Sequence, residues 1–283
     1  MSTFPAIAGP YLSRRKIRQD SANFERLFRA HFGMSTATCE EVWQELIPSN
    51  LHHTIEKKHL LWTLFYLKVY SSIDVSASKF GVTAPTWRKW VELTLDSLSE
   101  LNVIHWNDRF ENWHSLLPSC YVDGVHCYAE ERRPMYRGDY SHKLNHAGWA
   151  FEVATALGTS KIVHIAGGVP AGDWPDLKLA RETLVPRLLP NEKVAADKGY
   201  REQQGNGNFI TPVVNRQNDP AVDAHNRVLK RMGARHETVN KRIKDFQILK
   251  TYRGEREKFP KIFKVVANLT QIKMRSEPLY SFQ

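Results

Sequence analysis

Three acidic residues lie where the sequence predicts ordered surroundings, and together they could do chemistry. Asp123 stands inside the apolar run 121–124, where an ionised carboxylate costs several kcal/mol to bury unless it is paired or bound to metal. Asp197 directly follows the apolar run 194–196, at the strand end where α/β sheets carry their sites. Glu237 lies in a long charged segment with a helical pattern. We interpret the three as candidate partners in one site.

The chemistry that suits three carboxylates is two-metal phosphoryl transfer. Two divalent cations about 3.5–4 Å apart polarise a scissile phosphate and stabilise the attacking and leaving oxygens. Mg²⁺ and Mn²⁺ prefer carboxylate oxygens, so no cysteine ligand is needed. Lys241 and Lys244 follow Glu237 on the same predicted helix face and are expected to contact DNA. With 30 acidic residues in the chain, the alternative of three unrelated carboxylates stays open.

The elements that must position these acids form a mixed α/β pattern after residue 117. Strand patterns are predicted at 116–127, 147–157, 161–166, 192–196 and 209–214, with helices at 177–184 and 223–249. Strands interspersed with helices predict a layered α/β fold with a mixed sheet and flanking helices. We place this domain at residues 118–275 and a short tail at 276–283.

The segment before it is predicted to be all helical, from residue 23 to 105. Helices at 60–70 and 84–98 flank a short segment at 74–80 and a Gly81-Val82 turn, which is the outline of a helix-turn-helix. Thr86, Arg88 and Lys89 would then stand at the start of the second helix and contact DNA. An ordinary helical hairpin with solvated charges is the alternative.

Residues 1–22 are interpreted as an extended basic arm. Turn-forming residues precede a basic cluster formed by Arg14, Arg15, Lys16 and Arg18. Such a cluster is typical of a nuclear address or of an arm that contacts a nucleic-acid backbone. The alternative is an unremarkable basic stretch, since such clusters are common.

Composition narrows the function classes. Lys and Arg number 40 against 30 Asp and Glu, a net charge of +10 with a pI near 9.5, which favours a polyanionic partner, nucleic acid first. The most apolar stretch, 60–67, is far shorter than the ~20 residues of a membrane span, so no membrane partner is expected. Three cysteines without C-x-x-C spacing disfavour disulfides and structural zinc. Nucleotide-binding glycine motifs and a serine-hydrolase elbow are absent.

Four histidines and one lysine are secondary candidates beside the acids. His126, His142, His146 and His164 lack zinc-ligand spacing and are expected to be structural. Lys143 is expected either to reach a phosphate or to be solvated.

Four motifs in order resemble the catalytic domain of PIF/Harbinger-type transposases, a group within the DDE superfamily. They are Tyr121-Val122-Asp123-Gly124, the loop 167–177, Ala196-Asp197-Lys198-Gly199-Tyr200, and Arg235-His236-Glu237 leading to Lys244-Asp245-Phe246. The second aspartate motif is also similar to that of related bacterial insertion-sequence transposases. The resemblance covers residues 118–275 and implies an RNase H-like fold. It also implies that Asp123, Asp197 and Glu237 are the catalytic, metal-binding acids, with Asp176 as an auxiliary metal residue.

The resemblance implies a transposase-like, metal-dependent DNA endonuclease and strand-transfer enzyme. The expected cofactors are two Mg²⁺ or Mn²⁺ ions. The expected partners are double-stranded DNA, further copies of this chain in a homo-oligomer, and an accessory DNA-binding protein. The expected location is the nucleus. One position departs from the family: Thr238 stands where an arginine is common. The alternative is therefore a domesticated, catalytically silent DNA-binding protein derived from a transposase.

Overall fold

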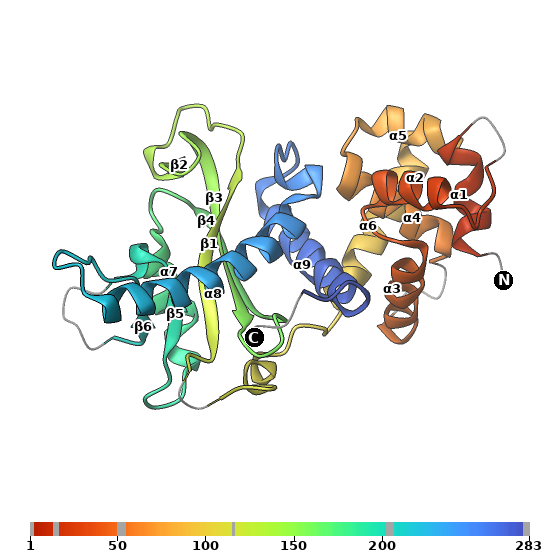
Figure 1. Ribbon diagram of the computed structural model, residues 1–283. Helices are drawn as coiled ribbons and strands as arrows, with labels where there is room; N and C mark the ends of the chain where they lie inside the picture. The colour runs from red at the N-terminus through yellow and green to blue at the C-terminus, as the bar shows by residue number, and fades with distance from the viewer. Residues whose placement is uncertain (1–2, 14–16, 50–54, 115–116, 202–206, 280–283) are drawn as a thin grey trace. The chain divides into compact units, whose positions relative to one another are not determined.

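The computed structural model describes residues 3–13, 17–49, 55–114, 117–201 and 207–279. The chain divides into two compact units (Figure 1). The first comprises Met1–Val103, Ile243–Lys250 and Lys261–Glu277, and the second comprises Ile104–Arg242, Thr251–Pro260 and Pro278–Gln283. The division differs from the predicted domain at 118–275, because two C-terminal segments of that range belong to the first unit.

The first unit is helical, as predicted for the N-terminal region. It contains α1 (Phe4–Leu12), α2 (Ala22–Phe32), α3 (Thr36–Ser49), α4 (Lys57–Val69), α5 (Ile73–Phe80), α6 (Ala84–Ser99), the 3₁₀ helix η5 (Gln247–Leu249) and most of α9 (Phe259–Ser276). The predicted short segment and second helix of the helix-turn-helix outline correspond to α5 and α6.

Helix α1 corrects the extended-arm interpretation of the N-terminus. Phe4, Ala8 and Leu12 recur at a spacing of four residues and are buried, so one helical face packs into the unit. Thr3 caps the helix, and Pro5 lies in the first turn, where the missing N–H costs nothing. Of the basic cluster, 14–16 lie outside the described residues.

Local signals explain the sharp connection between α5 and α6. Gly81 ends α5 in the left-handed conformation, with φ +67°, which glycine adopts without steric cost. The Thr83 side chain then accepts from the Thr86 N–H and caps α6. Trp87 and Val91 bury the inner face of α6.

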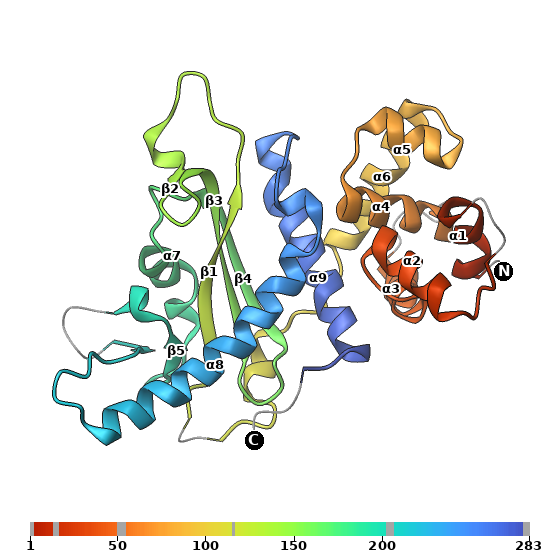
Figure 2. The same ribbon diagram turned by 45° about the horizontal axis from the view of Figure 1, so that its top comes forward.

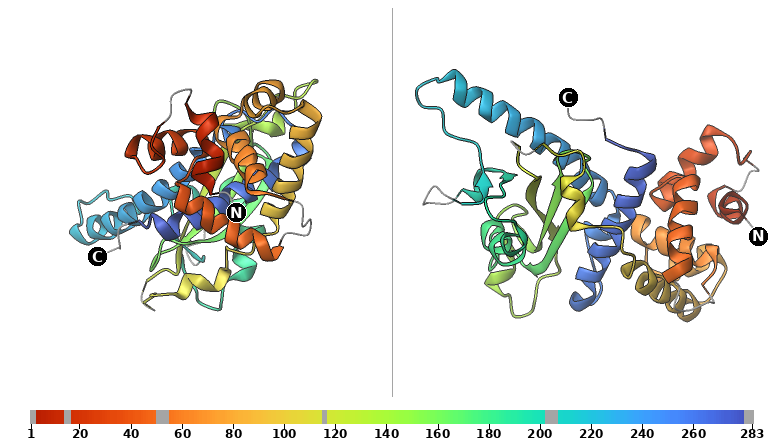
Figure 3. Two further views of the ribbon diagram at one scale, coloured as in Figure 1. Left: turned by 90° about the vertical axis from the view of Figure 1, so that its right-hand side faces the viewer. Right: turned by 90° about the horizontal axis from the view of Figure 1, so that it is seen from below.

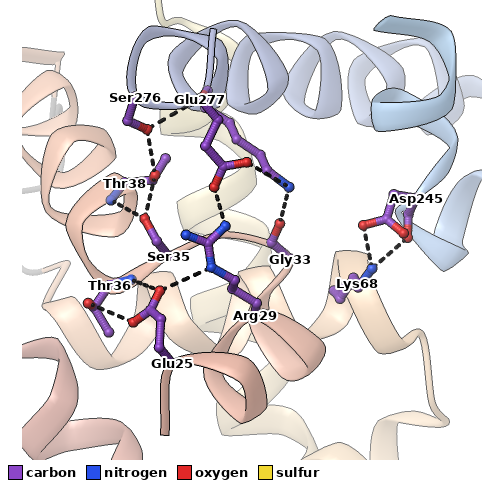
Figure 4. A network of polar contacts seen from close by, with 11 residues as sticks. Glu25, Arg29, Gly33, Ser35, Thr36, Thr38, Lys68, Asp245, Ser276 and Glu277 are labelled. Atoms are coloured by element: carbon purple, nitrogen blue, oxygen red, sulfur yellow. Dashed lines mark hydrogen bonds and ion pairs between the residues drawn. The ribbon is translucent and has the colours of Figure 1, made fainter. Parts of the chain in front are cut away.

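Ion pairs attach the C-terminal segments to the first unit (Figure 4). Arg29 pairs with Glu25, at 3.2 Å from its Nε, and with Glu277. Lys68 pairs with Asp245 at 2.6 Å. The Arg29–Glu277 and Lys68–Asp245 pairs join positions more than a hundred residues apart in the sequence, which explains why the segments around 245 and 277 belong to this unit.

The second unit is built on a mixed sheet (Figures 1 and 2). Its elements are β1 (Cys120–Tyr128), β2 (Tyr140–Ser141), β3 (His146–Ala156), β4 (Ile162–Pro170), β5 (Val194–Ala196), β6 (Phe209–Ile210), α7 (Asp176–Thr183), α8 (Pro220–Lys244, to Arg242 in this unit) and the 3₁₀ helices η1 (Trp106–Phe110), η2 (Arg137–Asp139), η3 (Val185–Arg187), η4 (Lys198–Tyr200) and η6 (Arg256–Lys258). The order is β2-β3-β1-β5-β6, with β4 also paired to β3. Pairings β1–β3 and β3–β4 are antiparallel, whereas β1–β5 and β5–β6 are parallel.

Helices cover both faces of this sheet, because side chains alternate along each strand. Val122 faces a cluster with Ala180 and Leu184 from the α7 side. Tyr121 faces the opposite cluster, with Leu229 and Met232 of α8. Figure 3 shows α7 and α8 on opposite sides of the strands in its right-hand view. The predicted mixed sheet with flanking helices is therefore confirmed.

A buried ion pair fixes the entry into this unit. Arg109 of η1 is 2% exposed and donates to both carboxylate oxygens of Glu192, at 2.7 and 3.1 Å. Its guanidinium also lies 4.0 Å from the centre of the Trp106 ring. Because Glu192 shortly precedes β5, this pair sets where β5 enters the sheet.

Candidate active site

Two of the predicted acids lie on neighbouring strands, Asp123 within β1 and Asp197 directly after β5. The parallel pairing of β1 with β5 runs through Tyr121↔Ala195 and Val122↔Ala196, and the next residues along the two strands are Asp123 and Asp197. Adjacent strands lie roughly 4.8 Å apart. The sheet therefore sets these aspartates at equivalent positions on adjacent strands.

Backbone amides hold both carboxylates. The Gly124 N–H donates to Asp123 Oδ1 at 2.8 Å. The Gly199 N–H donates to Asp197 Oδ1 at 2.7 Å, so Asp197 caps the short helix η4. Both side chains are thereby oriented without any bound ligand.

Burial makes the Asp123 carboxylate unusually basic. Burial raises its pKa to about 6, the Lys143 charge lowers it, and the charges of Asp176 and Asp197 raise it further. Its side chain keeps 24% of its surface exposed. A raised carboxylate pKa beside other carboxylates is typical of a functional site.

Helix α8 lies against the same face of the sheet. The His236 ring is 5.2 Å from the Tyr121 ring. A Cβ on Gly233 would lie 2.9 Å from the Tyr121 hydroxyl oxygen, so the helix can approach this closely because position 233 is glycine. Glu237 stands one turn after Gly233 and is exposed.

The charges of the three predicted acids all affect the pKa of one hydroxyl group, that of Tyr121. Burial raises the pKa of Tyr121 to about 12, and the negative charges of Asp123, Asp197 and Glu237 add to the rise. Such effects weaken with distance, and the pairing of β1 with β5 independently sets Asp123 and Asp197 on adjacent strands. That Glu237 joins them in one site stays a prediction.

Asp176 comes from the other side of the sheet. It is the first residue of α7, and a Cβ on Gly124 would lie only 2.0 Å from its Oδ1. His126 Nε2 lies 3.4 Å from that Oδ1, and His126 Nδ1 lies 2.6 Å from Ser141 Oγ. Burial opposes ionisation, but contacts from His126 and Lys143 outweigh it and lower the pKa of Asp176.

Lys143 connects the two acidic groups. Its Nζ lies 2.9 Å from Asp176 Oδ2 and 3.7 Å from Asp123 Oδ1, and it donates to the Gly124 carbonyl at 3.1 Å. Burial opposes the charge on Lys143, but Asp176 and Asp123 outweigh burial and raise the pKa of Lys143. The sequence predicted that this lysine either reaches a phosphate or is solvated, whereas in the structure it is paired with carboxylates.

Within the part of the chain that the structure describes, no group of three or more His, Cys, Asp or Glu side chains is arranged to hold a metal ion. The donor set nevertheless fits a hard divalent cation, because it consists of carboxylates. Burial is the main cause of the raised pKa of Asp123, and the nearby Lys143 charge lowers that pKa.

The residues predicted to contact DNA are exposed. Thr86, Arg88 and Lys89 lie in the first two turns of α6, and Lys241 and Lys244 lie near the end of α8. Their contact with DNA stays a prediction.

A family model described as DDE superfamily endonuclease matches residues 122–271. The chain belongs to this family. The stretch that matches the DDE superfamily endonucleases contains Asp123, Asp176, Asp197 and Glu237. No curated protein and no solved structure matches the chain. Among the described helices, none is both long and apolar enough to span a bilayer.

Proposed function

We propose that this DDE superfamily endonuclease is a transposase-like nuclease of the PIF/Harbinger type that cleaves DNA with Asp123, Asp197 and Glu237. The observation that carries the proposal is the parallel pairing of β1 with β5, which sets Asp123 and Asp197 at equivalent positions on adjacent strands, within the stretch that matches the endonuclease family. A family of endonucleases supplies the reaction class, namely cleavage of phosphodiester bonds. Strand transfer by a freed 3′-hydroxyl is the expected second step.

The sheet agrees with the RNase H-like fold that the resemblance implies. Three antiparallel strands, β1, β3 and β4, are followed by β5, which lies parallel to β1. Helices cover both faces. Asp197 directly follows the carboxyl end of β5, where open α/β sheets bind their ligands, and Asp123 lies within the neighbouring strand β1.

We propose that the three acids hold two Mg²⁺ or Mn²⁺ ions and that Asp176 assists. Bound there, such ions would polarise the scissile phosphate and lower the pKa of the attacking water. The chain's own residues prepare the site: the Gly124 and Gly199 amides orient Asp123 and Asp197. Above pH 6 Asp123 is mostly ionised.

DNA binding would use the helical unit and α8. We propose that α5 and α6 act as a helix-turn-helix, with Thr86, Arg88 and Lys89 at the DNA, and that Lys241 and Lys244 contact the backbone. The net charge of +10 supports a polyanionic partner. A homo-oligomer, an accessory DNA-binding protein and a nuclear location belong to the same proposal.

A nicking assay on supercoiled plasmid tests the proposal. The parent is expected to relax the plasmid with Mg²⁺ or Mn²⁺ and not with EDTA. Asp197→Asn and Glu237→Gln should each abolish nicking, whereas Glu182→Gln, an exposed acid on α7, should nick as the parent does. Equal nicking by the parent and both acid variants would refute the assignment.

The alternative is a catalytically silent DNA-binding protein derived from a transposase. Thr238 in place of the usual arginine, and a lysine between two of the carboxylates, favour it. DNA retardation by a parent that nicks with neither metal, and that gains no stability from Mn²⁺, would establish this alternative.

A further inference from the structure

The segment between β1 and β3 carries a pocket of about 800 Å³. It is lined by Glu131, Arg132, Met135, Tyr136, Arg137, Gly138, Asp139, Tyr140, His142, Ala147, Gly172 and Asp173. Three of its large side chains are strongly exposed: Met135 at 78%, Tyr136 at 45% and Tyr140 at 42%. Exposed apolar and aromatic side chains gathered around one hollow are typical of a ligand site.

The aromatic wall of this pocket is held in place. Tyr136 donates its hydroxyl hydrogen to Asp173 Oδ2 at 2.7 Å, and the Arg132 guanidinium lies 4.9 Å from the centre of the Tyr136 ring. Gly138 permits this packing, because a Cβ there would lie 2.3 Å from Asp173 Oδ2. The Tyr136 ring is therefore fixed before any ligand arrives, although much of its surface is exposed.

Charged side chains of both signs line the pocket, and its buried carboxylate is paired with arginines. Asp139 is 2% exposed and pairs with Arg132 at 2.9 Å and with Arg256 at 3.1 Å. Two guanidinium groups thus compensate a single carboxylate. Arg137 is exposed at the rim and is available to an anion.

The pocket shares a wall with the candidate active site. Tyr140 and His142 line the pocket, and Ser141 between them lies 2.6 Å from His126 Nδ1. The next residue, Lys143, pairs with Asp176 and Asp123. A strand of DNA at the acids is therefore within reach of the pocket.

We propose that the pocket binds an unpaired nucleotide next to the scissile phosphate. Its base stacks on the Tyr136 ring, and its phosphate pairs with Arg137. Stacking on an aromatic side chain accepts any base, and arginine recognises phosphate through several donors. The volume lies within the usual range for small-ligand sites. This inference rests on the proposed function, since it takes DNA as the substrate.

The test compares a blunt duplex with the same duplex carrying a three-nucleotide overhang of 2-aminopurine. Binding is measured by anisotropy in EDTA, where cleavage does not occur, and stacking by quenching of 2-aminopurine fluorescence. The parent is expected to prefer the overhang and to quench it. Tyr136→Ala should weaken overhang binding about 5- to 100-fold and leave blunt-duplex binding unchanged.

Two further variants test whether overhang binding depends on the Tyr136 ring itself. Tyr136→Phe keeps the ring and removes the bond to Asp173, so overhang preference should persist. Tyr128→Ala removes another exposed tyrosine, at the end of β1 and outside the pocket, and should behave as the parent. A parent without overhang preference, or a Tyr136→Ala variant that retains it, would overturn the inference.

The result is independent of the outcome of the nicking assay. If the parent does not nick DNA but prefers the overhang through Tyr136, the result supports the proposed nucleotide pocket and contradicts the catalytic proposal. A parent that nicks and binds blunt and overhanging duplexes equally would reject the pocket alone.

Discussion

Replacing Asp123 by asparagine is expected to stabilise the metal-free protein while it abolishes DNA cleavage. The folded state raises the Asp123 pKa from 3.8 to about 6, mainly through burial. The folded protein therefore binds this proton more tightly than the unfolded chain does, and ionisation opposes folding. Asparagine keeps an oxygen for the Gly124 N–H, which donates to Asp123 in the parent, and removes the charge.

The magnitude follows from the two pKa values. The difference between 3.8 and about 6 corresponds to about 3 kcal/mol of free energy of unfolding. The full gain is expected above pH 7. It should fall to about half at pH 5, because the parent carboxylate is then largely protonated in the folded state, and it should vanish below the unfolded pKa.

Urea unfolding in EDTA, monitored through hydrogen exchange of the β1 and β3 amides, measures this gain in stability for the second unit, which contains the sheet. Glu182→Gln is the matched control and should change stability by less than about 0.5 kcal/mol at either pH. With Mn²⁺ added, the parent should gain stability and Asp123→Asn should not. Destabilisation by Asp123→Asn at pH 7.5 in EDTA, or a gain equal at pH 5 and 7.5, would refute the reasoning.

Three further substitutions test the supports of the site. Gly124→Ala places a Cβ 2.0 Å from Asp176 Oδ1, so it should cost about 1–3 kcal/mol in urea unfolding and reduce nicking; wild-type stability would contradict the contact. Lys143→Met removes a cation beside the carboxylates and should tighten Mn²⁺ binding measured by electron paramagnetic resonance; weaker binding would show that the lysine assists the metal instead. Arg109→Ala leaves Glu192 buried and unpaired and should cost about 3–5 kcal/mol in urea unfolding; a loss below about 1 kcal/mol would contradict a structural pair.

The sequence predicted the mixed sheet and the positions of β1, β3, β4, β5 and β6, because strand patterns follow burial directly, whereas the two-residue strand β2 was not predicted. The glycine and prolines at positions 5, 9 and 10 predict an extended arm, whereas the structure has helix α1 there. Its buried face, with Phe4, Ala8 and Leu12, nevertheless had helical spacing. The family match supports the reaction class, whereas the roles of Asp123, Asp197 and Glu237 stay predictions.

Other features depend on contacts between distant segments, which no local pattern carries. The apolar face of α9 does not indicate which unit it packs against, and the structure assigns most of that helix to the first one. Tyr121 was expected only as a strand residue, and its proximity to the acids depends on the close approach of Gly233. The pocket segment contains an arginine- and tyrosine-rich run, at 132–140, that could have indicated a ligand site.

The charges around the sheet edge argue for a cation beyond Lys143. Four carboxylates, those of Asp123, Asp176, Asp197 and Glu237, act in this region, and Lys143 is the cation paired with two of them. Burial is the largest cause of the rise of the Asp123 pKa to about 6; the Lys143 charge lowers this pKa, and the charges of Asp176 and Asp197 raise it. Like charges held together by backbone amides and helix packing cost stability, and a divalent cation is the ligand that would offset that cost. A divalent cation bound at these acids is therefore expected to raise the stability of the parent protein, and Asp123→Asn is expected to lose that gain.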